Sequence, residues 1–315
     1  MIEIPTARAA RRRALALVTC ALVVAFVAPA RAESFVIEFA PDDGEAWTKS
    51  TVDRRSQNYG PTAPTREQVT TVETDQRYAS QPDGSWIVAQ SLGRITMTMN
   101  GKPVDNPMLP ILRTQEIELV VNGGGIATDA LGFRSLMRRY ERELPPETYQ
   151  NIRQQMKIDN LVLGELIKWN RALDGLHGRE LETGQTLAVN DARTEFHGSV
   201  IPVTGVVEIG DWTELGGFRG VSIVYRYDNT GAILAGAGET DGEVVRSTEK
   251  EPSELRGRVE LEGQIEFVVV PSSGQLLSEH LMETARAVFP QSPGQTAVIE
   301  VESTSTWTPV EEDES

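Results

Sequence analysis

The chain has almost none of the residues that carry the commonest forms of catalysis and metal binding. Its one cysteine is Cys20, so the chain after it can form no disulfide, thiol nucleophile or cysteine metal site. Its three histidines are His177, His197 and His280, and none has a ligand-type neighbour at helical spacing. We therefore predict no metal centre built on cysteine or histidine.

Motifs for activated serines and bound phosphates are missing as well. No Gly-x-Ser-x-Gly sequence occurs, and Ser199 is followed by a strand pattern rather than a helix. Gly123, Gly124 and Gly125 lack the lysine and the strand-turn-helix context of a nucleotide-binding loop. We predict no catalytic residues of these classes and no cofactor, and we expect the protein not to be an enzyme.

Positive charge is scarce. The chain has 30 Lys and Arg against 46 Asp and Glu, for a net charge of −16. Residues 1–32 carry five arginines and one glutamate, so the rest of the chain is close to −20. A chain this acidic is repelled by nucleic acid and by anionic membrane surfaces. We therefore predict no nucleic-acid partner.

The N-terminus has the three parts of an export signal. Arg11–Arg13 supply the positive charge, an apolar run follows at 14–28, and Ala30-Arg31-Ala32 has the small-x-small form of a cleavage site. The apolar run is too short for a confident membrane span. We predict a signal peptide at 1–32 that is cleaved after Ala32, export to the periplasm or the medium, and no stable membrane span afterwards. Both the general secretory and the twin-arginine routes remain open.

A helical segment is predicted at 131–180. Its first apolar residues recur every three or four positions, as on one face of a helix: Phe133, Leu136, Met137 and Tyr140. Leu144-Pro145-Pro146 must end this helix, and Pro146 suits the first turn of a second one. We expect the second helix to bend or split at Asp159-Asn160 and to stop near Gly175 or Gly178.

Both flanks of this segment read as β structure, at 33–130 and 181–308, with an acidic disordered tail at 309–315. Asp83-Gly84 and Asn100-Gly101 each predict a tight hairpin. Residues 275–288 fit a helix or a strand, and we favour a strand because 297–307 needs a neighbour. The predicted fold class is α+β, mainly curved antiparallel sheet. Whether the two β-rich halves form one sheet or two domains is left open.

Only weak binding candidates emerge. Trp212 lies between Gly210-Asp211 and Gly216-Gly217, so its ring could face a sugar or a lipid, although buried anchoring is the default for a tryptophan. Asp42, Asp43 and Asp241 lie in acidic glycine-containing loops that could hold calcium weakly through oxygen ligands. Solvated loops are the plainer interpretation.

The layout resembles a family of secreted bacterial proteins of unknown function. The shared features are the export signal, the x-Asp-Gly-x turns, the helical middle and the Leu-x-x-Gly-x-x-Leu segment at Leu181–Leu187. Long curved strands with helices on one side also look like periplasmic lipid and lipoprotein carriers. The resemblance to the family implies no known activity, and the likeness to carriers is one of shape alone. The abundant sheet, the missing catalytic residues and the export signal favour an exported, non-enzymatic protein that binds an apolar ligand or a segment of an envelope partner on a concave sheet.

Two other functions remain open from the sequence. A carboxylate-based hydrolase outside the cytoplasm would need two acidic side chains about 5–10 Å apart in a cleft. A structural assembly factor of the envelope would expose an apolar patch.

Overall fold

The computed structural model describes residues 32–60, 63–171, 173, 175–196, 199–229, 232–234, 257–288 and 296–310. Residues 1–31 of the predicted signal peptide, residues 311–315 of the predicted tail, His197 and Asp241 lie outside these ranges. Pro309, the first residue of the predicted tail, is described and pairs with Trp47 as part of a strand. The chain from Ser34 onward forms one unit, which is described below.

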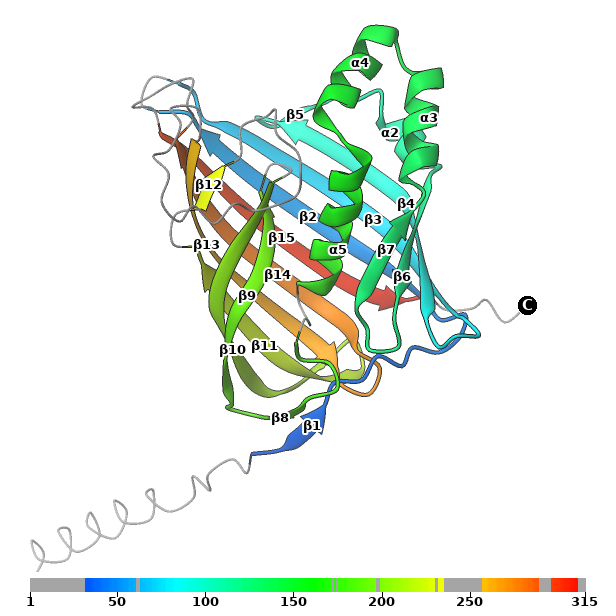
Figure 1. Cartoon of the computed structure of the whole chain (residues 1–315), viewed down its shortest axis with the longest axis vertical. Coiled ribbons are helices and arrows are strands. Elements are labelled where there is room, and N and C mark those ends of the chain that lie inside the picture. Colours follow the sequence, from blue (N-terminus) through cyan, green and yellow to red (C-terminus); the bar gives the residue numbers. More distant parts are fainter. Residues whose placement is uncertain are drawn as a thin grey trace, which may run out of the picture. The chain divides into compact units, whose positions relative to one another are not determined.

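Most of this unit is one curved, open sheet of 13 strands (Figure 1). The strands are β2 (Ala46–Asn58), β3 (Arg66–Ser80), β4 (Trp86–Met99), β5 (Lys102–Pro103), β6 (Glu116–Val121), β7 (Ala127–Leu131), β9 (Thr186–Phe196), β10 (Ser199–Leu215), β11 (Phe218–Asp228), β12 (Ala232–Leu234), β13 (Gly257–Val270), β14 (Gln275–Val288) and β15 (Thr296–Pro309). The main path runs β7-β6-β4-β3-β2-β15-β14-β13-β11-β10-β9, with β5 on β4 and β12 on β13. The predicted fold class, α+β with mainly antiparallel sheet, is confirmed.

The two β-rich halves form one sheet because the last strand pairs with the first long one. β15 and β2 are antiparallel, with Val298 opposite Asn58 at one end and Pro309 opposite Trp47 at the other. Separately, β1 (Ser34–Val36) and β8 (Glu180–Glu182) form a two-stranded sheet.

Local turn chemistry sets the hairpins as expected. Asn100 and Gly101 have φ values of 49° and 75°, and Met99 pairs with Lys102, so the connection is a two-residue hairpin of the primed type. Gly84, with φ of 82°, lies in the turn between β3 and β4. Residues 275–288 form β14, which pairs with β13 and β15, so the favoured strand is confirmed.

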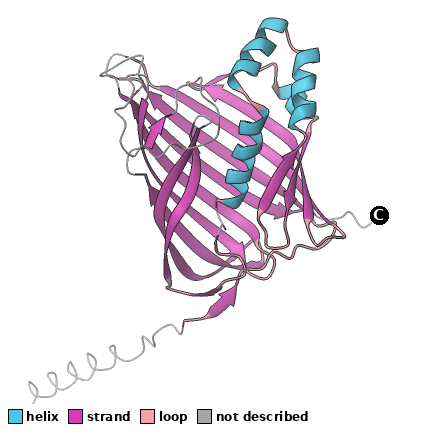
Figure 2. Ribbon diagram, viewed as in Figure 1, coloured by secondary structure: helices cyan, strands magenta, loops and turns pink. Residues whose placement is uncertain are grey.

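The helices lie over one side of the sheet (Figure 2). They are α2 (Leu109–Leu112), α3 (Phe133–Glu143), α4 (Pro146–Gln155) and α5 (Ile158–Asn170). α3 ends before Leu144, whose backbone is extended, and α4 begins at Pro146, as the proline pair predicts.

Two details of the helical segment differ from the expectation. The break falls at Met156 and Lys157, both extended, rather than at Asp159-Asn160. Asp159 then lies in the first turn of α5, where a carboxylate is favoured by the helix dipole. α5 stops at Asn170, and Leu173, which follows the end of the helix, is buried in the core.

α5 bridges the two edge strands of the open sheet. It contacts both β7 and β9 (Figure 1). The Asn170 side chain accepts a hydrogen bond from the Ala127 amide at 2.9 Å and donates one to the Ala127 carbonyl at 3.1 Å. The Trp169 indole N–H donates to the Gly125 carbonyl at 3.0 Å. Side chains of the helix thus pair with backbone groups of the edge strand β7 and of the turn before it.

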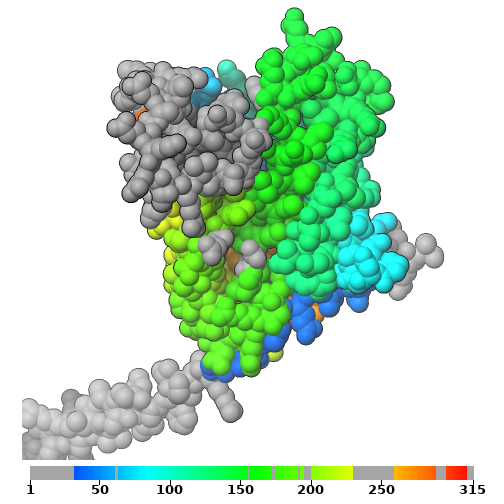
Figure 3. All heavy atoms as spheres, in the orientation of Figure 1, coloured from blue at the N-terminus to red at the C-terminus, as the bar shows by residue number. Residues whose placement is uncertain are grey.

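Two apolar clusters form the core. One gathers around the C-terminal half of the sheet, including Ile223, Ile265 and Phe267, and the other around the helices and the N-terminal half, including Leu119, Val121 and Tyr140. Figure 3 shows the same face of the molecule with all atoms drawn, where the green helical segment lies in front of the sheet.

Candidate functional site

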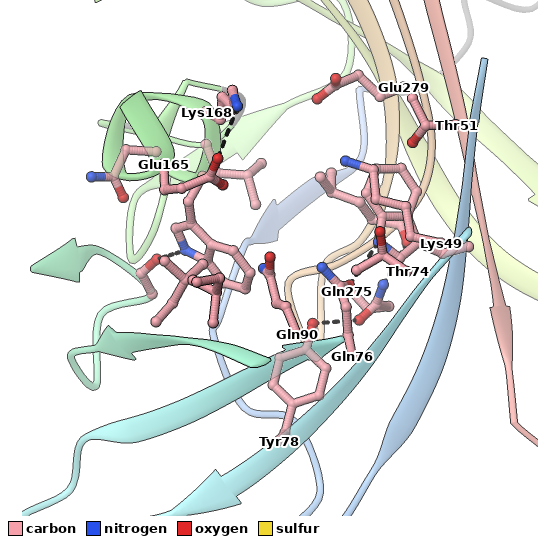
Figure 4. A pocket seen from close by; sticks show the side chains of 18 of the residues that line it. Lys49, Thr51, Thr74, Gln76, Tyr78, Gln90, Glu165, Lys168, Gln275 and Glu279 are labelled. Carbon is pink, nitrogen blue, oxygen red and sulfur yellow. Dashed lines mark hydrogen bonds and ion pairs between the residues drawn. The ribbon is translucent and has the colours of Figure 1, made fainter. Parts of the chain in front are cut away.

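A cavity of about 370 Å³ lies between the curved sheet and α5. Its walls come from β2, β3, β4, β6, β14 and β15 of the sheet, from α3 and α5, and from the turn after α5. Figure 4 shows Lys49 reaching into it from β2, opposite Glu165 and Lys168 of α5. The volume falls in the range of about 300–1,000 Å³ that is typical of small-molecule sites.

One wall of the cavity is polar. Alternate residues of β2 point to it because successive side chains of a strand face opposite sides: Lys49, Thr51 and Asp53. Their antiparallel neighbours on β3 continue the wall with Thr74, opposite Lys49. Gln76, which is 6% exposed, follows Thr74 on the same face.

Lys49 is the distinctive residue of this wall. Its ammonium lies 4.5 Å from the centroid of the Trp307 ring, its neighbour on β15, as in a cation–π contact. Within the described part of the chain it forms no ion pair. Burial lowers the pKa of the Lys49 amine from its ordinary value, an effect that the Glu279 carboxylate partly opposes.

The hydrogen bonds around Lys49 leave donors on the cavity side. The Trp307 indole N–H donates to Gln76 Oε1 at 3.0 Å, so the amide nitrogen of Gln76 remains as a donor. Thr51 Oγ1 and Ser305 Oγ lie 2.9 Å apart and share a hydrogen bond. Thr74 adds a hydroxyl beside the ammonium.

Apolar side chains form much of the remaining lining. They include Phe39, Leu119, Phe133, Leu136 and Leu173, which also belong to or pack against the core clusters. The cavity therefore combines a continuous apolar surface with polar groups from the sheet and from α5, as an amphiphilic molecule requires.

Two of the three acidic residues that line the cavity are ion-paired. Glu165 Oε1 lies 2.8 Å from Lys168 Nζ on the same helix. Glu279 Oε1 lies 3.2 Å from an Arg171 nitrogen, and both side chains are largely buried. The Glu279 carboxylate is the main favourable influence that raises the pKa of Arg171 against burial. The third is Asp53.

A second polar group lies further along β14. The Tyr227 hydroxyl donates to Glu283 Oε2 at 2.8 Å, and Thr194 Oγ1 lies 3.5 Å from the same oxygen. Burial raises the pKa of the Tyr227 phenol well above its ordinary value, and the Glu283 charge adds to this effect. The ring of Tyr227 also covers Gly263, where an added Cβ would lie 2.4 Å from Tyr227 Cζ.

The binding candidates from the sequence lie elsewhere. Trp212 sits after a β-bulge in β10, partly buried, 5.5 Å from the Phe35 ring and 4.1 Å from the Arg219 guanidinium carbon. It is not among the residues that line the cavity. Its role in ligand binding stays a prediction.

The acidic loop is held by its own hydrogen bonds. Asp43 Oδ1 accepts from the Ser80 amide at 2.7 Å and from its hydroxyl at 2.9 Å, which lower the pKa of Asp43. The Asp42 amide donates to Glu45 Oε2. No group of three or more metal-ligating side chains is present among the described residues. Calcium binding by Asp42, Asp43 and Asp241 stays a prediction.

The cavity residues gave little signal in the sequence. The stretch around Lys49 reads as half-exposed strand because polar residues occupy both faces of β2. One feature could have marked the site, namely a lysine two residues after a tryptophan in a lysine-poor chain. Of the histidines, His177 lines the cavity beside Phe39, with ring centroids 6.2 Å apart, and His280 lies 3.3 Å from Glu302.

Comparisons with known proteins give only distant likenesses. No family model and no curated protein matches the chain. Solved structures that resemble it include lipovitellin, with 10% identity, a TM-score of 0.47 and 87% of this chain covered. The chain spans 26% of that lipovitellin chain. None of the α-helices in the described residues is long and apolar enough to span a membrane.

Two bacterial structures cover most of the chain at lower scores. A DUF1329 family protein from Desulfovibrio piger is 8% identical, with a TM-score of 0.22 and 85% of each chain covered. DynF from the dynemicin pathway of Micromonospora chersina is 6% identical, with a TM-score of 0.20, 91% of this chain and 90% of that chain covered. Likenesses this weak transfer neither ligand nor activity to this chain.

Proposed function

We propose that the protein is an exported binding protein that carries the apolar part of a small amphiphilic molecule in the cavity between the curved sheet and α5. The observation that carries this proposal is the cavity itself, about 370 Å³ with an apolar body and a polar wall. Such a combination is typical of sites that bury a ligand's hydrocarbon part and orient it with a few polar groups.

The export in this proposal is inferred from the N-terminal sequence. Arg11–Arg13, the apolar run at 14–28 and Ala30-Arg31-Ala32 support export. The absence of cysteine after Cys20 means that the exported chain would depend on its core rather than on disulfides. A binding protein outside the cytoplasm would meet lipids and other envelope amphiphiles there.

Native mass spectrometry of the full-length product from its own host tests the proposal. We expect the wild-type protein to carry a small molecule that organic extraction releases. Thr74→Trp should abolish this added mass, because the new ring would fill the cavity beside Lys49. Thr96→Trp, exposed on β4, is the matched control and should keep it.

The proposal would be overturned by a specific result. If the wild type carries no small molecule and takes up none from an excess of host lipid extract, the cavity is not a carrier site. Equal loading of Thr74→Trp and Thr96→Trp would place any bound molecule elsewhere.

A further inference from the structure

Lys49 forms no ion pair with any carboxylate of the described residues. It lies on the polar wall, and among the described residues its one close interaction with charge character is the contact with the Trp307 ring. A partly buried ammonium loses hydration that a ring contact replaces only in part. The cavity thus contains a positive charge whose partner would have to come from a ligand.

The acidic side chains around the cavity do not supply that partner. Glu279 is held by Arg171 and Glu165 by Lys168. Asp53 is four residues from Lys49 along β2, about 13 Å at the rise of an extended strand. No carboxylate of the described chain lies within 4.0 Å of the Lys49 ammonium as an ion pair.

Two neutral donors lie on the same wall as Lys49. Thr74 is directly opposite Lys49, and Gln76 offers its amide nitrogen because its oxygen already accepts the Trp307 bond. An ammonium flanked by a hydroxyl and an amide donor matches the two oxygens of a carboxylate. A doubly charged phosphate is less suitable. Lys49 is the one lysine lining the cavity for which the described residues supply no ion pair, and the Glu279 carboxylate contributes a negative potential here.

We infer that Lys49, with Thr74 and Gln76, forms the head-group subsite for a carboxylic acid whose hydrocarbon chain lies along the apolar wall of Phe39, Leu119 and Leu136. This inference rests on the proposed function and narrows it to one ligand class, the long-chain carboxylic acids. Binding is non-covalent, and the carboxylate of the ligand forms the ion pair with Lys49 that no described residue supplies.

Bromine-labelled ligands give a direct readout because Trp169 and Trp307 both line the cavity, and bromine quenches tryptophan fluorescence on contact. The probes are 12-bromododecanoic acid and 12-bromododecan-1-ol, titrated into the wild type, Lys49→Met and Lys102→Met. Lys102 is exposed on β5, away from the cavity lining, and serves as the control. Dodecyl phosphate is added as a competitor of the bromo acid.

We expect the wild type and Lys102→Met to bind the acid at least about tenfold more tightly than the alcohol, as for a charge-assisted hydrogen bond. Lys49→Met should bind the acid no more tightly than the alcohol, because the loss of the ammonium weakens acid binding far more than alcohol binding. Retained alcohol binding shows that the variant is folded and that its cavity is intact. Dodecanoic acid should displace the bromo acid better than dodecyl phosphate does.

The possible failures are distinguishable. Equal affinity of the wild type for acid and alcohol, or a preference for acid that survives in Lys49→Met, overturns the head-group assignment but leaves the carrier function standing. Stronger competition by dodecyl phosphate overturns the carboxylate class. If neither probe binds the wild type, both the head-group assignment and the carrier function for such chains are wrong.

Discussion

Asn170→Ala should weaken the contact between the end of α5 and the edge strand β7. Asn170 takes the place of a missing strand partner for Ala127. Its Oδ1 accepts a hydrogen bond from the Ala127 amide, and its amide nitrogen donates one to the Ala127 carbonyl. Ala127 is 4% exposed, so removing the side chain leaves a buried amide and a buried carbonyl without their hydrogen-bond partner. Each unsatisfied group costs about 1–3 kcal/mol, and we expect the free energy of unfolding to fall by about 2–4 kcal/mol.

Two measurements check this value. Urea unfolding followed by tryptophan fluorescence gives the change in the free energy of global unfolding. Hydrogen exchange of the Ala127 amide gives the change in the free energy of local opening at β7. A loss of 2 kcal/mol at this edge corresponds to roughly 30-fold faster exchange. Asn160→Ala is the control, since Asn160 lies in the same helix and none of the hydrogen bonds found for the described residues involves its side chain.

Two results would refute the reasoning. If the free energies of unfolding of Asn170→Ala and Asn160→Ala both stay within about 0.5 kcal/mol of the wild type, the contact between α5 and β7 does not depend on the Asn170 side chain. Faster exchange spread evenly over β3 and β14 but absent at Ala127 would also contradict it, because the loss would then be global rather than at the edge of β7.

Two further predictions concern single residues inside the curved sheet. Lys49→Met should raise the free energy of unfolding at pH 7 by about 1 kcal/mol, since it removes a poorly compensated charge. The unfolded chain keeps the Lys49 proton up to about pH 10.5, whereas the folded protein releases it at a lower pH, so wild-type stability rises over that interval. The advantage of the variant should therefore shrink as the pH approaches 10.5, and a difference independent of pH would contradict the charge explanation. Gly263→Ala should cost more than about 2 kcal/mol, because its Cβ would displace Tyr227 from Glu283, as urea unfolding would show. Gly93→Ala, whose nearest contact would be 3.7 Å, should be close to neutral in the same assay, and equal effects would refute the packing argument.

The elements that the sequence predicts well are those that local chemistry decides. Asn100-Gly101 specifies its turn through the left-handed backbone of both residues, and Leu144-Pro145 ends a helix through a steric clash. The apolar residues of 275–288 fit the spacing of a helix and that of a strand, so only the pairing of this segment with β13 and β15 makes it a strand. The end of α5 was placed too late, because Leu173 continues the apolar spacing although tertiary packing carries it into the core beyond the helix.

The candidate site was hidden for a different physical reason. The alternation of apolar and polar residues identifies the buried face of a strand only when one face is apolar. β2 has polar side chains on both faces. Lys49 and Asp53 therefore looked like solvent-facing residues. Trp212 was singled out because glycines flank it, yet those glycines belong to a bulged strand and a hairpin rather than to a binding loop. What brings Lys49 to the cavity is the order of strands across the sheet, which no local pattern contains.

The polar wall is hard to explain as a structural feature. Well-packed apolar side chains at Lys49, Thr74 and Gln76 would join the sheet to the helices at least as firmly, because burying polar groups stabilises a fold only when they are fully paired. These three residues instead leave an ammonium, a hydroxyl and an amide nitrogen directed at about 370 Å³ of space. α5 is fastened to the sheet edge at Asn170 and to β14 through Arg171, so the helix end holds that space without filling it. An arrangement that leaves these groups without packing becomes more stable only when another molecule occupies the cavity. This property agrees with the carrier function proposed above.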